Sequence, residues 1–273
     1  MQSNWQHAIN QALGKNYLWE WFAKGSSNTL YRGCDGEHCI VLRKNVPAER
    51  TPGVDRQREA LLLELISGHD WAPHIIKNHV ADAWCAMKLY QAIPNKPQLT
   101  PRQQKQLIQA IGQLQQITTT QLTDEQITQL TMDYDALWEN VYRPQAQAKN
   151  DQTALRWIHD IKQGFDKLPP TTACLVHHDL HIGNLAQQNA PPTVTNDTQS
   201  NTLTILDWEY GGLGNPWLDA ASLLSDCKIS PAAIATLPAF QQHTAAEFHD
   251  GLKQAMHIKE RLTKLWCWAR GNT

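Results

Sequence analysis

The sequence predicts an α+β fold, in which a small antiparallel sheet comes first and a mostly helical part follows. Residues 17–44 alternate β-rich runs with two turns, the first at residues 25–28 and the second at the dipeptide Asp35-Gly36, a pattern typical of hairpins. Beyond a proline-rich connection, apolar residues recur at the three- and four-residue spacing of amphipathic helices. Two short apolar runs within that helical part predict one embedded hairpin.

Each expected element has a local signal. Leu61, Leu62, Leu65 and Ile66 lie on one face of a helix predicted over residues 55–67. A stretch rich in Gln, Asn, Thr and Pro indicates an exposed insertion with little order at residues 187–202. We expect strands at residues 17–23, 29–32, 39–43, 173–176 and 203–206, two more within 75–93, and further helices at residues 101–116, 123–143, 153–167 and over most of the chain from 215.

The composition is that of a soluble globular enzyme. Hydrophobic residues make up 41% of the 273 residues and charged residues 18%, with a net charge of -2. We expect neither nucleic acid nor a membrane as partner, since both attract a clustered basic surface. Residues 1–12 are polar and lack the apolar run of a signal peptide, and no run approaches the about 18 apolar residues of a membrane span. These features predict a cytoplasmic protein.

The six cysteines form no recognisable framework. They are scattered through a chain much longer than a disulfide-rich miniprotein, and no export signal precedes them. Cys34 and Cys39 lie close together with His38 beside them, but no second Cys or His pair follows at zinc-finger spacing. We therefore expect all six cysteines to be reduced thiols.

Two stretches in the C-terminal half combine acidic residues with strand signals. The first, HHDLHIGNL at residues 177–185, places Asn184 five positions after Asp179. The second, LTILDWEYGG at residues 203–212, ends a strand with Asp207 and Glu209. Phosphoryl transfer requires a carboxylate that orients the acceptor hydroxyl and accepts its proton, together with hard oxygen ligands that hold Mg²⁺ on ATP. The spacing of Asp179 and Asn184 is that of the protein-kinase catalytic loop.

These stretches, extended to LTILDWEYGGLGNPWLDAA, resemble the aminoglycoside phosphotransferase and choline kinase superfamily, and the DWEY segment is nearest to its thiamine and choline kinase branch. The resemblance extends weakly over most of the chain. It implies a protein-kinase-like two-lobe fold, with a nucleotide-binding lobe over residues 1–92 and a helical lobe over residues 93–273 that holds the catalytic loop and the acceptor site. It also implies ATP as co-substrate and Mg²⁺ as cofactor.

The resemblance assigns roles to individual residues. Asp179 would be the catalytic base, and Asn184 and Asp207 would hold Mg²⁺. Arg43 would bind the ATP phosphates, a role that suits its planar, permanently charged fork, with Glu59 as its partner carboxylate. A phosphate-covering turn and a strand-and-hinge segment would complete the ATP site, through Gly25, Ser26, Ser27, Asn28, Met87 and Leu89.

Some residues keep two interpretations. Glu209 could assist the metal, contact the acceptor or form an ion pair. Trp266 and Trp268 could border the acceptor pocket, where ring faces attract cations, or pack in the core. Asp219 is expected to be a structural brace or an N-terminal helix cap rather than a ligand, and His178 stands where the family usually has a small residue. A zinc site on the clustered histidines is not expected, because no helix surrounds them.

The sequence therefore predicts an ATP-dependent small-molecule kinase that phosphorylates a hydroxyl group, with thiamine or a choline-like cation as the expected acceptor. An antibiotic kinase for aminoglycosides or macrolides is the alternative, but the C-terminal residues 240–273 are not strongly acidic. An alternative of another class is a non-catalytic nucleotide-binding protein. Such a protein should have lost Asp179, Asn184 or Asp207, and all three are present.

Overall fold

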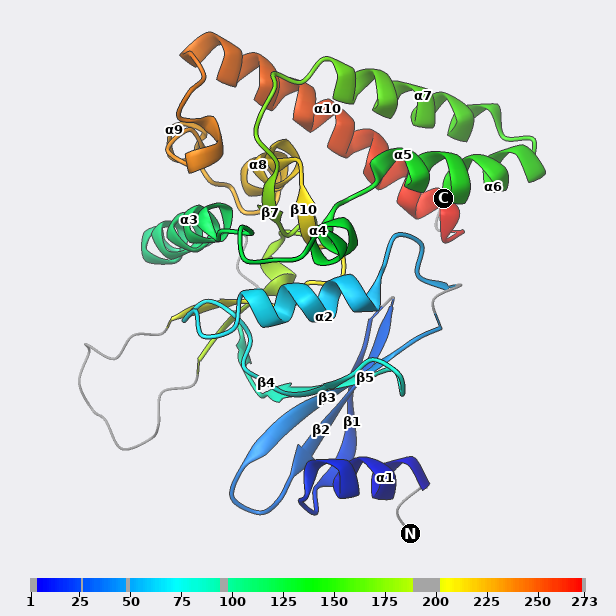
Figure 1. The fold of residues 1–273 in the computed structure, drawn as a ribbon, viewed down its shortest axis with the longest axis vertical. Helices are drawn as coiled ribbons and strands as arrows, with labels where there is room; N and C mark the ends of the chain where they lie inside the picture. The colour runs from blue at the N-terminus through cyan, green and yellow to red at the C-terminus, as the bar shows by residue number, and fades with distance from the viewer. Residues whose placement is uncertain (1–3, 26, 48–49, 94–97, 189–201, 272–273) are drawn as a thin grey trace.

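The computed structural model describes residues 4–25, 27–47, 50–93, 98–188 and 202–271. An antiparallel sheet and a larger helical body lie on either side of helix α2 (Arg56–Leu65), which crosses the middle of Figure 1. This arrangement confirms the predicted α+β class, with strands first and helices after. No helix within the described ranges is both long enough and apolar enough to cross a membrane.

The sheet contains five strands in the order β1-β2-β3-β5-β4. Neighbouring strands are antiparallel, and Arg43 lies opposite Cys85, while Val41 lies opposite Met87. Because these positions are two apart along each strand, the four side chains share one face, the face on which Arg43 meets α2. The strands are β1 (Leu18–Lys24), β2 (Asn28–Cys34), β3 (Cys39–Asn45), β4 (Ile75–His79) and β5 (Trp84–Lys88).

Helix α1 (Asn4–Leu13) covers the opposite face of the sheet and is not among the elements that the sequence predicts (Figure 1). Trp5, Ile9 and Leu13 recur every four residues and pack on a buried cluster formed by the sheet. That spacing is a helical signal, but the polar residues around it obscure it.

Cys34 and Cys39 form a disulfide, so the expectation of six reduced thiols is wrong at this pair. They occupy directly opposite positions on β2 and β3, with 4.2 Å between their Cα atoms. The short turn at Asp35-Gly36 brings the two sulfur atoms together, a consequence of the hairpin register that composition does not reveal. Cys85, Cys174, Cys227 and Cys267 are free.

The helical body is built from short and long helices around the paired helices α7 and α10. The long helices confirm the periodicity of residues 101–116, 153–167 and the C-terminal part. The helices are α3 (Pro101–Gln116), α4 (Asp124–Leu130), α5 (Tyr134–Ala136), a π-helix at Leu137–Tyr142, α6 (Arg143–Ala148), α7 (Gln152–Asp166), α8 (Pro216–Ser225), α9 (Pro231–Ile234), a 3₁₀ turn at Pro238–Phe240 and α10 (Ala245–Ala269).

The prediction of one helix over residues 123–143 is wrong, because the chain is extended around Thr131. Thr131 forms a bridge with Leu213, and the Met132 N–H donates to the Leu213 carbonyl at 2.9 Å. Asp133 then caps the next helix by accepting from the Ala136 N–H. A tertiary contact with a distant strand therefore overrides the local helical periodicity.

Two small sheets carry the motif segments. Strand β7 (Cys174–Val176) pairs with β10 (Gly212–Gly214), and β8 (Leu185–Gln187) pairs with β6 (Gln91–Ala92) and β9 (Leu203–Ile205). The two strands of the predicted embedded hairpin are present as β7 and β9, but the prediction that they pair is wrong, because β7 pairs with β10 and β9 pairs with β8. Most of the predicted insertion, residues 189–201, lies outside the described residues.

Helix α2 packs as part of the helical body. Leu62, Leu63 and Ile66 belong to one large buried cluster with residues of α3, α8 and α10. A separate, smaller cluster lies between α1 and the sheet. The boundary between the two apolar cores therefore runs between α2 and the sheet.

Two helical glycines offer a test of this packing. A Cβ atom at Gly251 of α10 would lie 2.4 Å from the ring of Trp217 on α8, whereas a Cβ at Gly112 of α3 would lie 3.8 Å from its nearest neighbour. We expect Gly251→Ala to lower the free energy of unfolding by about 1–3 kcal/mol through overpacking. Gly112→Ala should raise it by about 0.5–1 kcal/mol, the ordinary helix gain of alanine over glycine. Urea denaturation measures both, and equal shifts would contradict the packing.

Candidate active site

The loop between β7 and β8 begins with a buried histidine that fixes its shape. His177 Nδ1 accepts from the Asp179 N–H at 3.2 Å, and His177 Nε2 lies 2.9 Å from the Leu206 carbonyl. Because Nδ1 is an acceptor, Nε2 carries the proton and donates to Leu206. Burial lowers the pKa of His177 to about 3, so the ring stays neutral. His177 therefore joins the loop that carries Asp179 to the strand end that carries Asp207.

His178 adopts a left-handed conformation, with φ at +66°. This region favours glycine, so a histidine here is strained. Its ring is held on both sides, since Nδ1 lies 3.2 Å from the Tyr210 carbonyl and Nε2 lies 2.9 Å from the Tyr134 hydroxyl. The departure from the small residue usual in the family is thus accommodated by hydrogen bonds of the side chain.

Asp219 holds the backbone of the same loop from α8. Its buried carboxylate accepts from the His177 N–H at 2.8 Å and from the His178 N–H at 2.7 Å. These bonds confirm the expected bracing role, whereas the cap of α8 is Asn215, which accepts from the Trp217 N–H.

Asp179 and Asn184 lie side by side, as their spacing predicts. Asn184 Nδ2 donates to the Asp179 carbonyl at 2.9 Å and to Asp179 Oδ2 at 3.0 Å. The Asn184 amide oxygen is therefore directed away from Asp179. Burial raises the pKa of Asp179 above its ordinary value, but 41% of its side chain is exposed, enough to meet a second molecule.

Asp207 is a half-buried carboxylate with one buried oxygen, and its charge is incompletely balanced. Its Oδ1 has no hydrogen-bond partner among the described residues and lies 3.6 Å from Arg43 Nη1. Burial and then Glu209 raise the pKa of Asp207 to about 7, although Arg43 acts in the opposite direction. An unpaired carboxylate oxygen close to the further acidic groups of Glu209 and Asp179 fits a hard divalent cation.

Arg43 and Glu59 form a bidentate ion pair across the boundary between the sheet and α2. Arg43 Nη1 donates to Glu59 Oε1 at 2.6 Å, and Nη2 donates to Oε2 at 2.8 Å. Both side chains are buried, with 5% and 2% exposure. Although burial opposes its ionisation, the neighbouring guanidinium groups hold the pKa of Glu59 below its usual range.

Arg56, a residue that the sequence did not indicate, links this pair to Glu209 in the loop after β9. Its Nη1 lies 2.8 Å from Glu59 Oε2, and its Nη2 lies 3.0 Å from Glu209 Oε2 and 3.1 Å from Asn28 Oδ1. Asn28 Nδ2 also donates to Glu209 at 3.1 Å. The i, i+3 spacing of Arg56 and Glu59 on α2 was the available signal. The ion-pair interpretation of Glu209 therefore describes its contacts.

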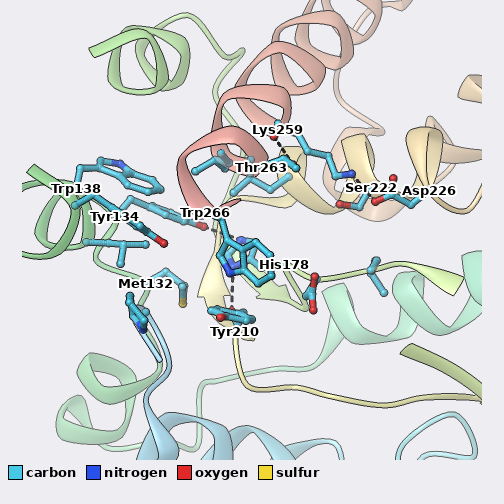
Figure 2. A pocket seen from close by; sticks show the side chains of 18 residues that line it. Met132, Tyr134, Trp138, His178, Tyr210, Ser222, Asp226, Lys259, Thr263 and Trp266 are labelled. Atoms are coloured by element: carbon cyan, nitrogen blue, oxygen red, sulfur yellow. Dashed lines mark hydrogen bonds and ion pairs between the residues drawn. The ribbon is translucent and has the colours of Figure 1, made fainter. Parts of the chain in front are cut away.

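A cavity of about 310 Å³ opens beside Asp179. Aromatic side chains from several elements form much of its wall, and a Lys259–Asp226 ion pair lies toward α8 and α10 (Figure 2). Trp266 lines this cavity, whereas Trp268 is buried elsewhere and donates from Nε1 to Asp151 at 2.7 Å. The aromatic lining consists of Tyr134, Trp138, Tyr142, Tyr210 and Trp266.

The residues that the sequence predicts to bind the nucleotide lie around the sheet. The Gly25 N–H donates to the Asn28 carbonyl at 2.9 Å and closes the turn between β1 and β2, in which Ser26 lies outside the described residues. Met87 lies on the same sheet face as Arg43, and Leu89 follows β5 directly. The structure thus brings the turn, the ion pair and both motif loops to one region between sheet and helical body.

The sequence profile of the phosphotransferase enzyme family matches residues 19–256. The chain belongs to this family. No curated protein matches the chain by sequence.

Solved structures of several phosphotransferases have the same fold. A spectinomycin phosphotransferase in complex with ADP and spectinomycin is 14% identical, with a TM-score of 0.65 over 99% of this chain and 87% of that one. A choline kinase from Streptococcus pneumoniae is 14% identical, with a TM-score of 0.62 over 98% and 92%. An ethanolamine kinase from Plasmodium vivax is 12% identical, with a TM-score of 0.67 over 98% and 80%.

These findings confirm the predicted superfamily, its two-lobe kinase-like fold and the prediction of a small-molecule phosphotransferase acting on an alcohol group. The roles of the individual residues of this phosphotransferase and the identity of its acceptor are matters of proposal.

Replacing Asp219 tests whether its carboxylate stabilises the loop between β7 and β8. Asp219→Ala leaves two buried backbone N–H groups without an acceptor, at about 1–3 kcal/mol each, so we expect a loss of about 3 kcal/mol in the free energy of unfolding. Asp219→Asn keeps the volume and one acceptor oxygen and should lose less. Guanidinium denaturation compares the two, and an unchanged stability of Asp219→Ala would show that the loop does not depend on this carboxylate.

Proposed function

We propose that this protein uses Mg²⁺ and ATP to phosphorylate a hydroxyl group of a small organic monocation. The observation that carries the proposal is the position of Asp179, which lies between the Asn184–Asp207 region and the mouth of the aromatic cavity. Solved structures of the same fold with bound ADP support a nucleotide co-substrate.

In this proposal Asn184 and Asp207 hold Mg²⁺, which would neutralise charge on the phosphates. Arg43, kept in place by Glu59, binds phosphate oxygens, and the turn at residues 25–28 covers them with backbone N–H groups. The backbone of Met87 and Leu89 binds adenine. Residues 1–92 would form the nucleotide lobe and residues 93–273 the acceptor lobe, with α2 packed against the second.

Asp179 is assigned the role of general base, which accepts the proton of the acceptor hydroxyl. The acceptor hydroxyl oxygen forms a bond to the γ-phosphorus, the bond from that phosphorus to the bridging oxygen of ADP breaks, and Asp179 accepts the hydroxyl proton. The bond from Asn184 Nδ2 to Asp179 Oδ2 orients this carboxylate. His177 keeps the loop in register with Asp207 through Leu206.

The charge and size of the cavity support a small monocation as acceptor. Asp179 and Asp226 are its two carboxylates, and Lys259 offsets Asp226. One uncompensated negative charge suits one positive charge, whereas a polycationic aminoglycoside would call for several carboxylates. A volume of about 310 Å³ is at the small end for ligand sites. Aromatic walls attract a quaternary ammonium or thiazolium ion, so thiamine and choline remain the leading acceptors.

Two substitutions separate proton transfer from metal binding. Asp179→Asn should keep Mg²⁺·ATP binding and lose at least a hundredfold in kcat, within the about 10²–10⁴-fold range of general-base catalysis. Asp207→Ala should lose Mg²⁺-dependent nucleotide binding itself. Calorimetric titration with Mg²⁺·ATP and an ATP-consumption screen over thiamine, choline, ethanolamine and kanamycin provide both readouts. A loss below about tenfold in Asp179→Asn would contradict its assigned role.

Paired acceptors test the cation preference. We expect kcat/KM for choline to exceed that for its neutral carbon isostere by more than about tenfold, because a desolvated cation over a ring gains up to about 2 kcal/mol. Trp266→Ala should reduce this ratio toward one.

Trp21→Ala is the matched control, since Trp21 is 65% exposed on β1 and does not line the cavity. It should keep the wild-type ratio. Equal rates for both acceptors in the wild-type enzyme, or a ratio unaltered in Trp266→Ala, would refute the monocation assignment and leave the phosphotransferase assignment intact.

A further inference from the structure

The end of helix α10 reaches two sites that are far apart in sequence. Trp266, in its last turn, lines the aromatic cavity beside Asp179. Arg270, which follows the helix, lies over the Trp266 ring, with 4.1 Å between the guanidinium carbon and the ring centroid. A guanidinium at this distance from an indole face is held by stacking and by cation–π attraction.

The same guanidinium reaches the turn between β1 and β2. Arg270 Nη2 donates to Ser27 Oγ at 3.3 Å, across a separation of 243 residues. Ser27 is 1% exposed, so the serine side of this contact is shielded from water. The last helix of the chain therefore touches the turn that, in the proposed function, covers the ATP phosphates.

The charge of Arg270 also affects the pKa of two tyrosines of the cavity. Burial raises the pKa of Tyr142 to about 12 and raises that of Tyr210, and the positive charge of Arg270 opposes both effects. Both tyrosines line the cavity. Arg270 is thus placed between the rim of the acceptor cavity and the turn.

The side chains of Ser27 and Asn28 are held by separate groups. Asn28 is bonded to Glu209, which lies in the loop after β9, and to Arg56, which lies on α2. Ser27 is bonded to Arg270, which belongs to the end of α10. The turn consequently has side-chain bonds both to the proposed metal side and to the acceptor side.

We propose that Arg270 is a positioning residue that fastens the turn through Ser27, and that Trp266 makes this fastening depend on the acceptor cavity. A ring held in place supports the guanidinium, and the guanidinium then holds the turn over the phosphates. The inference rests on the proposed function, because it requires that the turn cover a bound nucleotide. Its consequence is that a residue of the acceptor cavity affects nucleotide affinity.

The test measures binding of Mg²⁺ with a non-hydrolysable ATP analogue by calorimetry, using the full chain and no acceptor. Arg270→Ala and Ser27→Ala should each weaken binding about tenfold, as expected for one hydrogen bond to a charged group. The double variant should be no weaker than either single variant, because both remove the same contact. Arg270→Lys keeps the charge but lacks the planar fork, and should not restore affinity.

The cavity arm of the test uses Trp266. Trp266→Ala should weaken nucleotide binding severalfold, and Trp266→Phe, which keeps a ring face, should restore most of it. Arg261→Ala is the control, since Arg261 lies on the same helix and pairs with Asp160, and it should bind the nucleotide like wild type. Thermal denaturation of every variant separates lost affinity from lost folding.

Two results would overturn the inference while wild-type protein binds the nucleotide. One is wild-type affinity in Arg270→Ala. The other is a loss of about a hundredfold in the double variant, the product expected if Arg270 and Ser27 act independently. Failure of the wild-type protein to bind the nucleotide would instead refute the proposed function, and this inference with it.

Discussion

The site depends on the balance of buried charge between the sheet and the helical body. Glu59 and Glu209 face two guanidinium groups, those of Arg43 and Arg56, at hydrogen-bond distance. Among the residues that the structure describes, Asp207 Oδ1 has no hydrogen-bond partner and lies 3.6 Å from Arg43 Nη1. Removing charged groups from water is costly unless each is paired, so this arrangement fixes how β3, α2, the β1–β2 turn and the loop after β9 lie together. The excess of negative charge is the physical basis for expecting a cation there.

Short-range patterns made much of this site predictable. The five-residue spacing of Asp179 and Asn184, and an acidic residue at a strand end, bring Asp179, Asn184 and Asp207 together because β8 pairs with β9 and His177 bonds the loop after β7 to Leu206. The long-range contacts of Arg56 and Arg270 could not be found in this way, because the i, i+3 spacing of Arg56 indicates only its pair with Glu59. Arg56 also pairs with Glu209, and the bond from Arg270 to Ser27 joins residues 243 positions apart. No local pattern encodes such a contact.

The same distinction applies to the fold. Strands and helices whose periodicity is reinforced by packing, such as β3 and α7, lie where the sequence predicts them. The predicted helix over residues 123–143 breaks because Met132 bonds to Leu213, a residue of a distant strand. The disulfide between Cys34 and Cys39 depends on the register of one hairpin, and a register is a property of paired strands rather than of composition.

Helix α2 has a consequence for movement. Its apolar residues Leu62, Leu63 and Ile66 are packed into the large core, while the sheet has its own smaller core with α1. If nucleotide exchange requires the sheet to move away from the helical body, the two separate at the boundary between β3 and α2, and α2 remains with the helical body. The bonds between Arg43 and Glu59 cross this boundary. They would be intact when the sheet lies against α2 and broken when it has moved away. The Arg43–Glu59 ion pair would therefore report whether the sheet lies against α2 or has moved away from it.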